Sequence, residues 1–141
     1  MKISILVVSI LALLIFVLIQ LVPFGQINFN PPVVSEPQWD SPETRSLVAT
    51  HCFDCHSNET NWPWYSRIAP ARWLIAMDVQ EGRLALNFSD WQHYPQPLAE
   101  MVEEVMQGSM PPAKYTIAHP QAAFTETTRA IFIEALGRSF K

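Results

Sequence analysis

The chain has 141 residues, of which 49% are hydrophobic, and a formal net charge of −4 at pH 7. This length accommodates one small globular domain together with an additional apolar segment. Thirteen Asp and Glu residues outnumber nine Lys and Arg residues. Since nucleic-acid binding requires a strongly basic surface, we expect no nucleic-acid partner.

The apolar segment covers residues 3–22, which contain no charge and only Ser4, Ser9 and Gln20 as polar residues. About twenty residues at helical rise are enough to cross the ~30 Å hydrocarbon core of a bilayer. A cleavable signal peptide is the alternative, but its apolar region would be shorter, about 7–15 residues, and would end in small residues. Val22, Pro23 and Phe24 stand there instead. The sequence therefore predicts an uncleaved transmembrane anchor over residues 1–22.

The few basic residues around this segment predict its orientation. Lys2 and the terminal amine precede it, and no Lys or Arg follows before Arg45. By the positive-inside rule, we expect the N-terminus in the cytoplasm, one pass through the membrane, and the rest of the chain on its outer side.

Residues 23–40 are rich in proline and lack helical periodicity, so they predict an extended linker. Residues 41–141 then form the predicted domain, which is close to the size at which a single core becomes practical. No part of it alternates apolar and polar residues with period two, which predicts an all-α fold. The start and stop signals of four helices stand at Ser41 to His56, from Pro70 to a weakening at Gly82, Pro97 to Gly108, and Thr125 to Gly137.

The most informative motif is Cys52-Phe53-Asp54-Cys55-His56, which has the C-x-x-C-H spacing of covalent haem attachment. Two thiols add to the vinyl groups on one edge of the porphyrin, and the imidazole reaches the iron from one face. On a helix, Cys52, Cys55 and His56 project from one face within about a turn. We therefore expect one haem c, tethered by the two cysteines and with His56 as the proximal iron ligand.

Other sites use a pair of cysteines at this spacing. A thioredoxin-like redox pair normally follows a strand in a βαβ pattern, and no strand-like run precedes Cys52. A zinc site would need a fourth ligand from one distant side chain, because the chain has only two cysteines. A plain disulfide is the third alternative.

Met110 is the candidate for the second iron ligand. It follows the predicted helix end at Gly108 and precedes Pro111 and Pro112, so it lies in a stiff extended loop that can present its thioether to the iron. A core methionine is the ordinary interpretation of such a residue. The alternatives for the sixth position are Met77, His93, His119 or an open site.

Aromatic and basic side chains near the motif can complete a haem site. The aromatic residues Trp62, Trp64, Tyr65, Trp73 and Trp91 can wall a macrocycle or form an ordinary core. Among the arginines, Arg83 is the candidate to pair with an anionic propionate.

Several motifs together resemble the bacterial haem-binding domain family related to cytochrome c. They are residues 52–57 (CFDCHS), 59–66 (ETNWPWYS), 86–91 (LNFSDW) and 110–112 (MPP), with Tyr115 and His119-Pro120. The resemblance covers nearly the whole domain from Ser41 onward. It implies a cytochrome c-like fold, covalent haem, a membrane-tethered periplasmic location and a redox role. Met77 departs from the family pattern, in which a histidine often precedes the pair corresponding to Asp78-Val79.

These observations predict a membrane-anchored monohaem c-type cytochrome that transfers single electrons at the periplasmic face of a bacterial inner membrane. We expect an electron carrier and not an enzyme, with redox proteins or a membrane respiratory complex as partners. The alternatives are a haem enzyme or gas sensor with an open or displaceable sixth position, and a structural haem subunit of a respiratory complex.

Overall fold

The protein is described by a computed structural model, which covers residues 2–23 and 28–140 and side chains from Ser4 onward. Residues 24–27 of the predicted linker, with Met1 and Lys141, lie outside the described residues. Within the described part the chain is helical and forms no strand, so the predicted all-α class is confirmed. The elements are α1 (Lys2–Gln20), α2 (Pro42–His56), η1 (Trp64–Arg67), α3 (Ala71–Ala85), α4 (Leu98–Gln107), α5 (Ala113–Ala118), η2 (Pro120–Ala122) and α6 (Glu126–Ser139).

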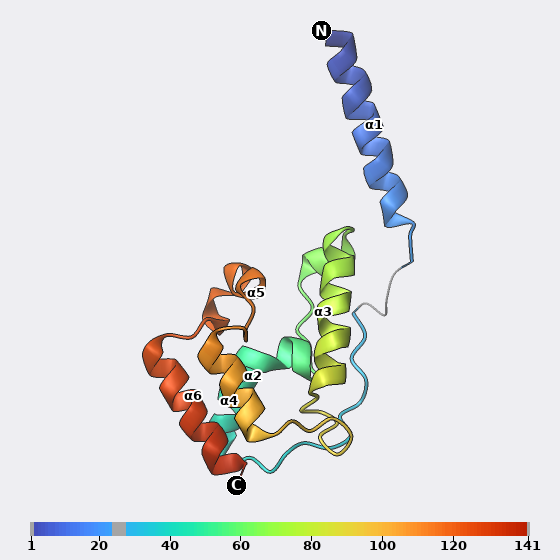
Figure 1. Cartoon of the computed structure of the whole chain (residues 1–141). Helices are drawn as coiled ribbons and strands as arrows, with labels where there is room; N and C mark the ends of the chain where they lie inside the picture. The colour runs from blue at the N-terminus through green and yellow to red at the C-terminus, as the bar shows by residue number, and fades with distance from the viewer. Residues whose placement is uncertain (1, 24–27, 141) are drawn as a thin grey trace. The chain divides into compact units, whose positions relative to one another are not determined.

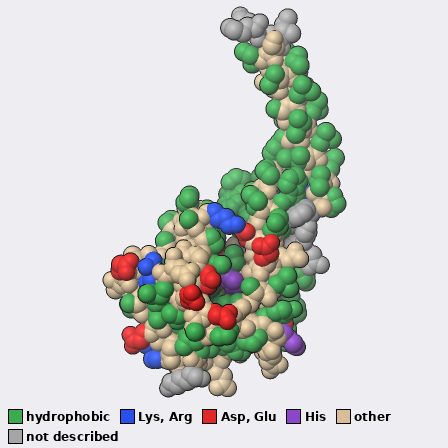
Figure 2. Space-filling model, in the orientation of Figure 1, with side chains coloured by type: hydrophobic (Ala, Val, Ile, Leu, Met, Phe, Trp, Pro, Cys, Tyr) green, Lys and Arg blue, Asp and Glu red, His purple; other side chains and the backbone are tan. Residues whose placement is uncertain are grey.

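The first helix, α1, is predominantly apolar, and its large hydrophobic residues from Ile5 to Leu18 are exposed. The face of α1 seen in Figure 2 is mostly hydrophobic along its length. The helix ends at Gln20, two residues before the end of the predicted span. Among the described residues, no helix has the length and apolar character needed to cross a membrane. The transmembrane anchor predicted over residues 1–22 is therefore not found in that part of the chain.

The structure divides into two compact units, and residues 1–29 and 62–78 form the first. Within this unit, the side chain of Gln20 at the end of α1 donates to the carbonyl of Ala69 (3.1 Å) and accepts from its amide (2.9 Å). Arg72 donates to the carbonyls of Gln20 and Val22. The bond from Arg72 to the Gln20 carbonyl occupies one of the carbonyls that the C-terminal end of α1 leaves without a partner inside the helix.

The second unit comprises residues 30–61 and 79–141, and its helices begin and end largely where the sequence predicts. Ser41 caps α2 by accepting from the amide of Thr44 (3.2 Å). Gly108 ends α4 in the left-handed conformation with φ 74°, which an L side chain adopts only with strain. Thr125 forms a capping box with Thr128 at the start of α6.

One predicted helix end needs correction, and one short helix was not predicted. The helix α3 continues past Gly82 to Ala85, and Gly137 does not end α6, which continues to Ser139. A glycine inside a helix costs only about 1 kcal/mol relative to alanine, so packing and neighbouring residues can maintain the helix. The short helix α5 has no counterpart among the predicted elements. Its six residues carry too few periodic positions for a helical pattern to be recognised.

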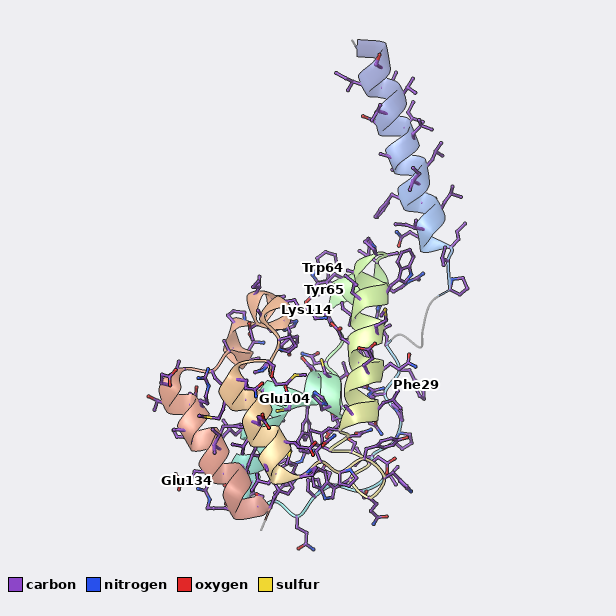
Figure 3. The ribbon with its side chains drawn as sticks, viewed as in Figure 1. Phe29, Trp64, Tyr65, Glu104, Lys114 and Glu134 are labelled. Carbon is purple, nitrogen blue, oxygen red and sulfur yellow. The ribbon has the colours of Figure 1, made fainter. Side chains whose placement is uncertain are left out.

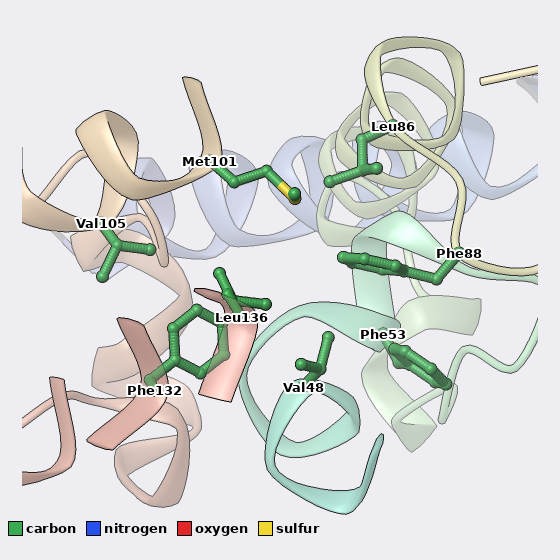
Figure 4. Packing of buried hydrophobic residues seen from close by; sticks show 8 residues of the cluster. All are labelled: Val48, Phe53, Leu86, Phe88, Met101, Val105, Phe132 and Leu136. Carbon is green, nitrogen blue, oxygen red and sulfur yellow. The ribbon is translucent and has the colours of Figure 1, made fainter. Parts of the chain in front are cut away.

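The core of the second unit lies where α6 packs beside α2 and α4 (Figures 1 and 4). Four aromatic and aliphatic residues there, Phe88, Phe132, Leu136 and Val48, are almost completely buried. The whole cluster comprises Val48, Phe53, Leu86, Phe88, Met101, Val105, Phe132 and Leu136. Burial of these side chains supplies the main force that holds the helices together.

The extended segment before α2 is bound to this unit. Ser35 forms an isolated bridge with Asp90, and the amide of Val34 donates to the carbonyl of Ser89 (2.8 Å). Trp39 packs against Phe53 and Phe88, with ring centroids 6.4 and 5.6 Å away. The second half of the proline-rich segment therefore contributes to the aromatic packing of the domain.

Candidate functional site

The two cysteines and the histidine of the C-x-x-C-H motif all lie in the last turns of α2 (Figure 1). Ser41, Pro42 and Glu43 supply the cap, the first-turn proline and the first-turn acid that start this helix fourteen residues earlier than His56. Helical spacing therefore gives Cys52, Cys55 and His56 a common side of α2. Neither cysteine is in a disulfide bond, so both sulfur atoms retain the hydrogen needed for addition to a vinyl group.

The imidazole of His56 is held in one orientation by backbone carbonyls. Its Nδ1 atom lies 2.9 Å from the carbonyl oxygen of Gly82 and 3.2 Å from that of Leu86. Both oxygens can only accept, which places the ring hydrogen on Nδ1 and the lone pair on Nε2. Burial is the main cause that lowers the pKa of His56 and favours this neutral form. A neutral imidazole with Nδ1 engaged and Nε2 available is the form that binds a metal ion.

Gly82 allows this arrangement because it has no side chain. A Cβ atom at this position would lie 2.6 Å from the carbonyl oxygen of Cys55 and 3.1 Å from its Cβ. Separations below 3.0 Å to a backbone atom are sterically excluded, so any larger residue would separate the end of α3 from the end of α2. The close contact is also what brings the Gly82 carbonyl within hydrogen-bond distance of His56.

The chemistry of Cys52 disfavours a redox pair. Burial, followed by the neighbouring Cys55, raises the pKa of the Cys52 thiol to about 12. Disulfide oxidoreductases instead lower the pKa of their attacking cysteine, because the thiolate is the reactive form.

A zinc site receives no support from the surrounding side chains. Across residues 2–23 and 28–140, no group of three or more His, Cys, Asp or Glu side chains is placed to hold a metal ion. A structural zinc site would require four such ligands.

A buried polar network fixes the residues that follow His56. The amide of Phe88 donates to the carbonyl of His56 (2.8 Å), and the amide of Asn58 donates to the hydroxyl of Ser89 (2.9 Å). The side chain of Asn87 donates to that of Asn58 (3.0 Å). Because these polar groups are buried and paired, the loop after α3 holds the end of α2 in a defined position.

The donor set and its geometry fit a haem attached at this helix end: two thiols without a disulfide, and an imidazole whose Nε2 is available for iron. A comparison with protein families agrees with that fit, because residues 14–137 match a family described as "Haem-binding domain". The chain belongs to the haem-binding domain family. No curated protein and no solved structure gives a significant match to this member of the family.

Met110 lies in a loop after the end of α4, as the sequence predicts, and the residue is 37% exposed. It is therefore not a packed core methionine, unlike Met101, which belongs to the buried cluster. Its amide donates to the carbonyl of Glu104 at the end of α4 (3.1 Å). Figure 3 labels Glu104 on α4 and Lys114 on α5, the two helices between which this loop runs.

The other candidates for the sixth iron ligand have different surroundings. His93 is exposed and its Nδ1 atom lies 2.7 Å from a carboxylate oxygen of Asp90. The ring of His119 stacks on that of Tyr115, with centroids 4.4 Å apart. Met77 belongs to the first unit, on α3, and is exposed. Each of these residues therefore remains an alternative to Met110 as the sixth iron ligand.

The aromatic residues and Arg83 also have defined roles. Trp91 stacks on Phe88 and Phe140 and is part of the aromatic packing of the second unit. Trp64 and Tyr65, labelled in Figure 3, contact each other edge to face in η1. Arg83 donates to the carbonyl of Ser57 (2.7 Å) and the hydroxyl of Thr60 (2.9 Å), so it stabilises the chain that follows the motif.

The sequence did not predict the roles of three residues at this site. Gly82 is predicted there only as a helix-weakening residue, although an isolated glycine inside a helical pattern also signals a close backbone approach. The other two are Asn58 and Asn87, which are both buried in the network around the motif. No local pattern in the sequence predicts that these two asparagines are buried, because their partners lie far away in the chain.

Proposed function

We propose that this haem-binding protein is a monohaem c-type cytochrome that transfers single electrons. Its Cys52 and Cys55 thiols each add across one vinyl group, the sulfur bonding one carbon and the hydrogen passing to the other. The bound haem supplies an iron that alternates between the ferric and ferrous states. The observation that supports the proposal most directly is the hydrogen bonding of His56 Nδ1, which leaves Nε2 to the iron.

Met110 is the proposed second axial ligand. Met110 is partly exposed and lies in a loop whose start is bound to the end of α4, and two prolines restrict the backbone that follows it. Histidine and methionine together raise the reduction potential of a haem. If His56 and Met110 both held the iron, no ligand position would remain for a substrate, which favours an electron carrier over an enzyme.

Attachment to the outer face of a bacterial inner membrane, with the N-terminus in the cytoplasm, is part of the proposal. Its support is the exposed apolar surface of α1 and the absence of charge from Ile3 to Val22. Covalent haem attachment takes place on that side of the membrane. The proposed partners are redox proteins, including a membrane respiratory complex. Extraction of membranes with alkaline carbonate tests the attachment, because a peripheral or soluble protein would be released.

The experiment that tests haem attachment uses the full chain, produced together with the cell's haem-ligation machinery. The intact mass should exceed that of the polypeptide by one haem, and acid–acetone should not extract the pigment. The Cys52→Ala/Cys55→Ala variant should lose the covalent pigment. A wild-type mass equal to that of the bare polypeptide would overturn the c-type assignment.

The spectrum of the ferric protein tests the axial ligands. We expect a low-spin spectrum with a weak near-infrared band from sulfur-to-iron charge transfer. Met110→Ala should abolish this band and allow carbon monoxide to bind the ferrous iron, whereas Met101→Leu, in the buried core, should retain the band. Carbon monoxide binding to the wild type would instead favour a sensor or enzyme with an open sixth position.

A further inference from the structure

A hydrogen bond joins α5 to the haem-attachment motif. The hydroxyl of Tyr115 donates to Oδ2 of Asp54 at 2.5 Å, across 61 positions of sequence. Asp54 stands between the two cysteines of the motif. A short bond from a hydroxyl to a carboxylate belongs to the stronger class of hydrogen bonds. The bond therefore connects a helix outside the motif directly to the turn of α2 that carries the cysteines.

The acceptor in this contact is itself fixed by other bonds. Oδ1 of Asp54 accepts from the amide of Asn61 (2.8 Å), and the carbonyl of Asp54 accepts from the hydroxyl of Thr60 (2.9 Å). The carboxylate plane is thus oriented by the segment that follows α2. Tyr115 meets an acceptor whose position does not depend on α5.

The position of α5 depends on individual side-chain contacts such as the Tyr115–Asp54 hydrogen bond. The helix has six residues and none of them is buried. So short a helix is marginal by itself, and it gains little from the apolar core. The ring of Tyr115 stacks on His119 just beyond the helix end, at an interplanar angle of 11°. The ring is thereby oriented from the side of α5, and its hydroxyl is oriented by Asp54.

Met110 precedes Tyr115 by five positions, and Pro111 and Pro112 limit the conformations between them. The other end of the loop is held by α4, where the amides of Ser109 and Met110 donate to the carbonyl of Glu104. We propose that the Tyr115–Asp54 hydrogen bond is the second attachment of this loop and positions the Met110 thioether for the haem iron. Tyr115 is thus a positioning residue, and this role rests on the proposed function of Met110 as an axial ligand.

The test compares Tyr115→Phe with wild type in the full, haem-loaded chain. The substitution removes only the hydroxyl. We expect the sulfur-to-iron band to weaken, carbon monoxide to bind the ferrous form, and the reduction potential to fall. Tyr94→Phe removes a hydroxyl from a tyrosine outside this contact and should retain the wild-type spectrum and potential. An intact band without carbon monoxide binding in Tyr115→Phe would overturn the positioning role while leaving Met110 as the ligand.

Amide hydrogen exchange supplies a readout that does not depend on the iron. In Tyr115→Phe, exchange over residues 113–118 should accelerate about tenfold or more, because the lost bond has a charged acceptor. Exchange over α6 should remain unchanged. Equal exchange of α5 in the two proteins would also contradict the proposal.

Two variants of Asp54 distinguish loss of the Tyr115–Asp54 hydrogen bond from a nonspecific effect of substitution at this position. The carboxamide in Asp54→Asn can still hydrogen-bond with both Tyr115 and the Asn61 amide, so this variant should retain most of the band. Asp54→Ala cannot form the bond, and its sulfur-to-iron band should weaken as much as that of Tyr115→Phe. Equal spectra for Asp54→Ala and wild type would overturn the proposal. If the wild type lacks the sulfur-to-iron band, Met110 is not an iron ligand, and the positioning role of Tyr115 is wrong as well.

Discussion

The Nδ1 atom of His56 lies 2.9 Å from the carbonyl oxygen of Gly82, 26 positions later in the chain. Gly82 is also the residue whose missing side chain lets α3 approach the backbone of Cys55. One glycine therefore provides both the close helix contact and the acceptor that orients the proposed iron ligand. In haem and metal sites, such a partner fixes the histidine tautomer and increases its basicity as a ligand.

Gly82→Ala tests this relationship. The added Cβ would lie 2.6 Å from a backbone oxygen, so α2 and α3 must separate. We expect a loss of about 1–3 kcal/mol in the free energy of unfolding, the usual range for overpacking. Denaturant unfolding measures it. Gly137→Ala is the matched control, because nothing lies within 4 Å of its Cβ, and it should be neutral or stabilise α6 by up to about 1 kcal/mol. Equal stability of Gly82→Ala and wild type would contradict the close approach.

Asn87→Ala tests the buried network around the motif. The substitution leaves Oδ1 of Asn58 and the amide of Ser89 without their partner in a buried site. We expect a loss of about 1–3 kcal/mol, the cost of leaving buried polar groups unsatisfied. Asn61→Ala is the control. Its side chain is exposed and its backbone amide still donates to Asp54, so unfolding should change by less than about 0.5 kcal/mol. Similar losses for both variants would show that the network is not the cause.

His51 predicts a dependence of stability on pH. Burial is the main cause that lowers its pKa below the ordinary value of 6.5, and the ring stacks on Phe124 with its Nδ1 atom 2.8 Å from the carbonyl of Ala122. The unfolded chain therefore binds a proton at a higher pH than the folded chain. The neutral His51 ring therefore contributes to the free energy of unfolding. This contribution is complete above pH 6.5 and is lost as the pH falls below 6.5 toward the lowered pKa.

The comparison is with His51→Asn, which keeps a donor near the Nδ1 position but does not titrate. Between pH 8 and 5, the free energy of unfolding should fall more steeply in wild type than in the variant. The difference between the two curves isolates His51 from His56, whose pKa is lowered in both proteins. Parallel curves would show that His51 does not cause the pH dependence.

Asp40 predicts a second, more acidic transition. A hydrogen bond from Thr44 and another from Arg138 (2.7 Å) lower the pKa of this carboxyl from 3.8 to about 2. The stability that it contributes is therefore complete above pH 3.8 and is lost as the pH falls toward about 2. Asp40→Asn should be less stable at pH 7 and should show a weaker loss across this interval, as measured by acid unfolding monitored with circular dichroism. An acid transition in Asp40→Asn that equals that of the wild type would show that Asp40 does not contribute to the loss of stability at low pH.

The parts of the fold that the sequence predicts are those with local signals. Ser41, Gly108 and Thr125 act through bonds to residues within about a turn, so their positions can be identified along the chain. The C-x-x-C-H motif is likewise confined to one helical turn. Haem binding could be predicted for that reason, and the match to the haem-binding domain family confirms it.

The remaining features depend on partners far apart in sequence. Tyr115 and Asp54 are 61 positions apart, and Asn87 and Asn58 are 29 apart. Periodicity and capping rules contain no information about such pairs, because they describe only neighbours within a helix or turn. The role of Gly82 cannot be predicted from the sequence for the same reason. A side chain is excluded at this position by Cys55, which lies on another helix.

The anchoring of residues 30–39 has a practical consequence for preparing the domain without α1. Asn30 binds Thr60 and Arg83, Glu36 accepts from Trp39 and Arg45, and the indole of Trp39 fills the space beside Phe88. An expression fragment truncated at Ser41 would remove all three residues and uncover aromatic surface prone to aggregation. A fragment that begins at or before Asn30 keeps them and is the sensible starting point for crystallisation.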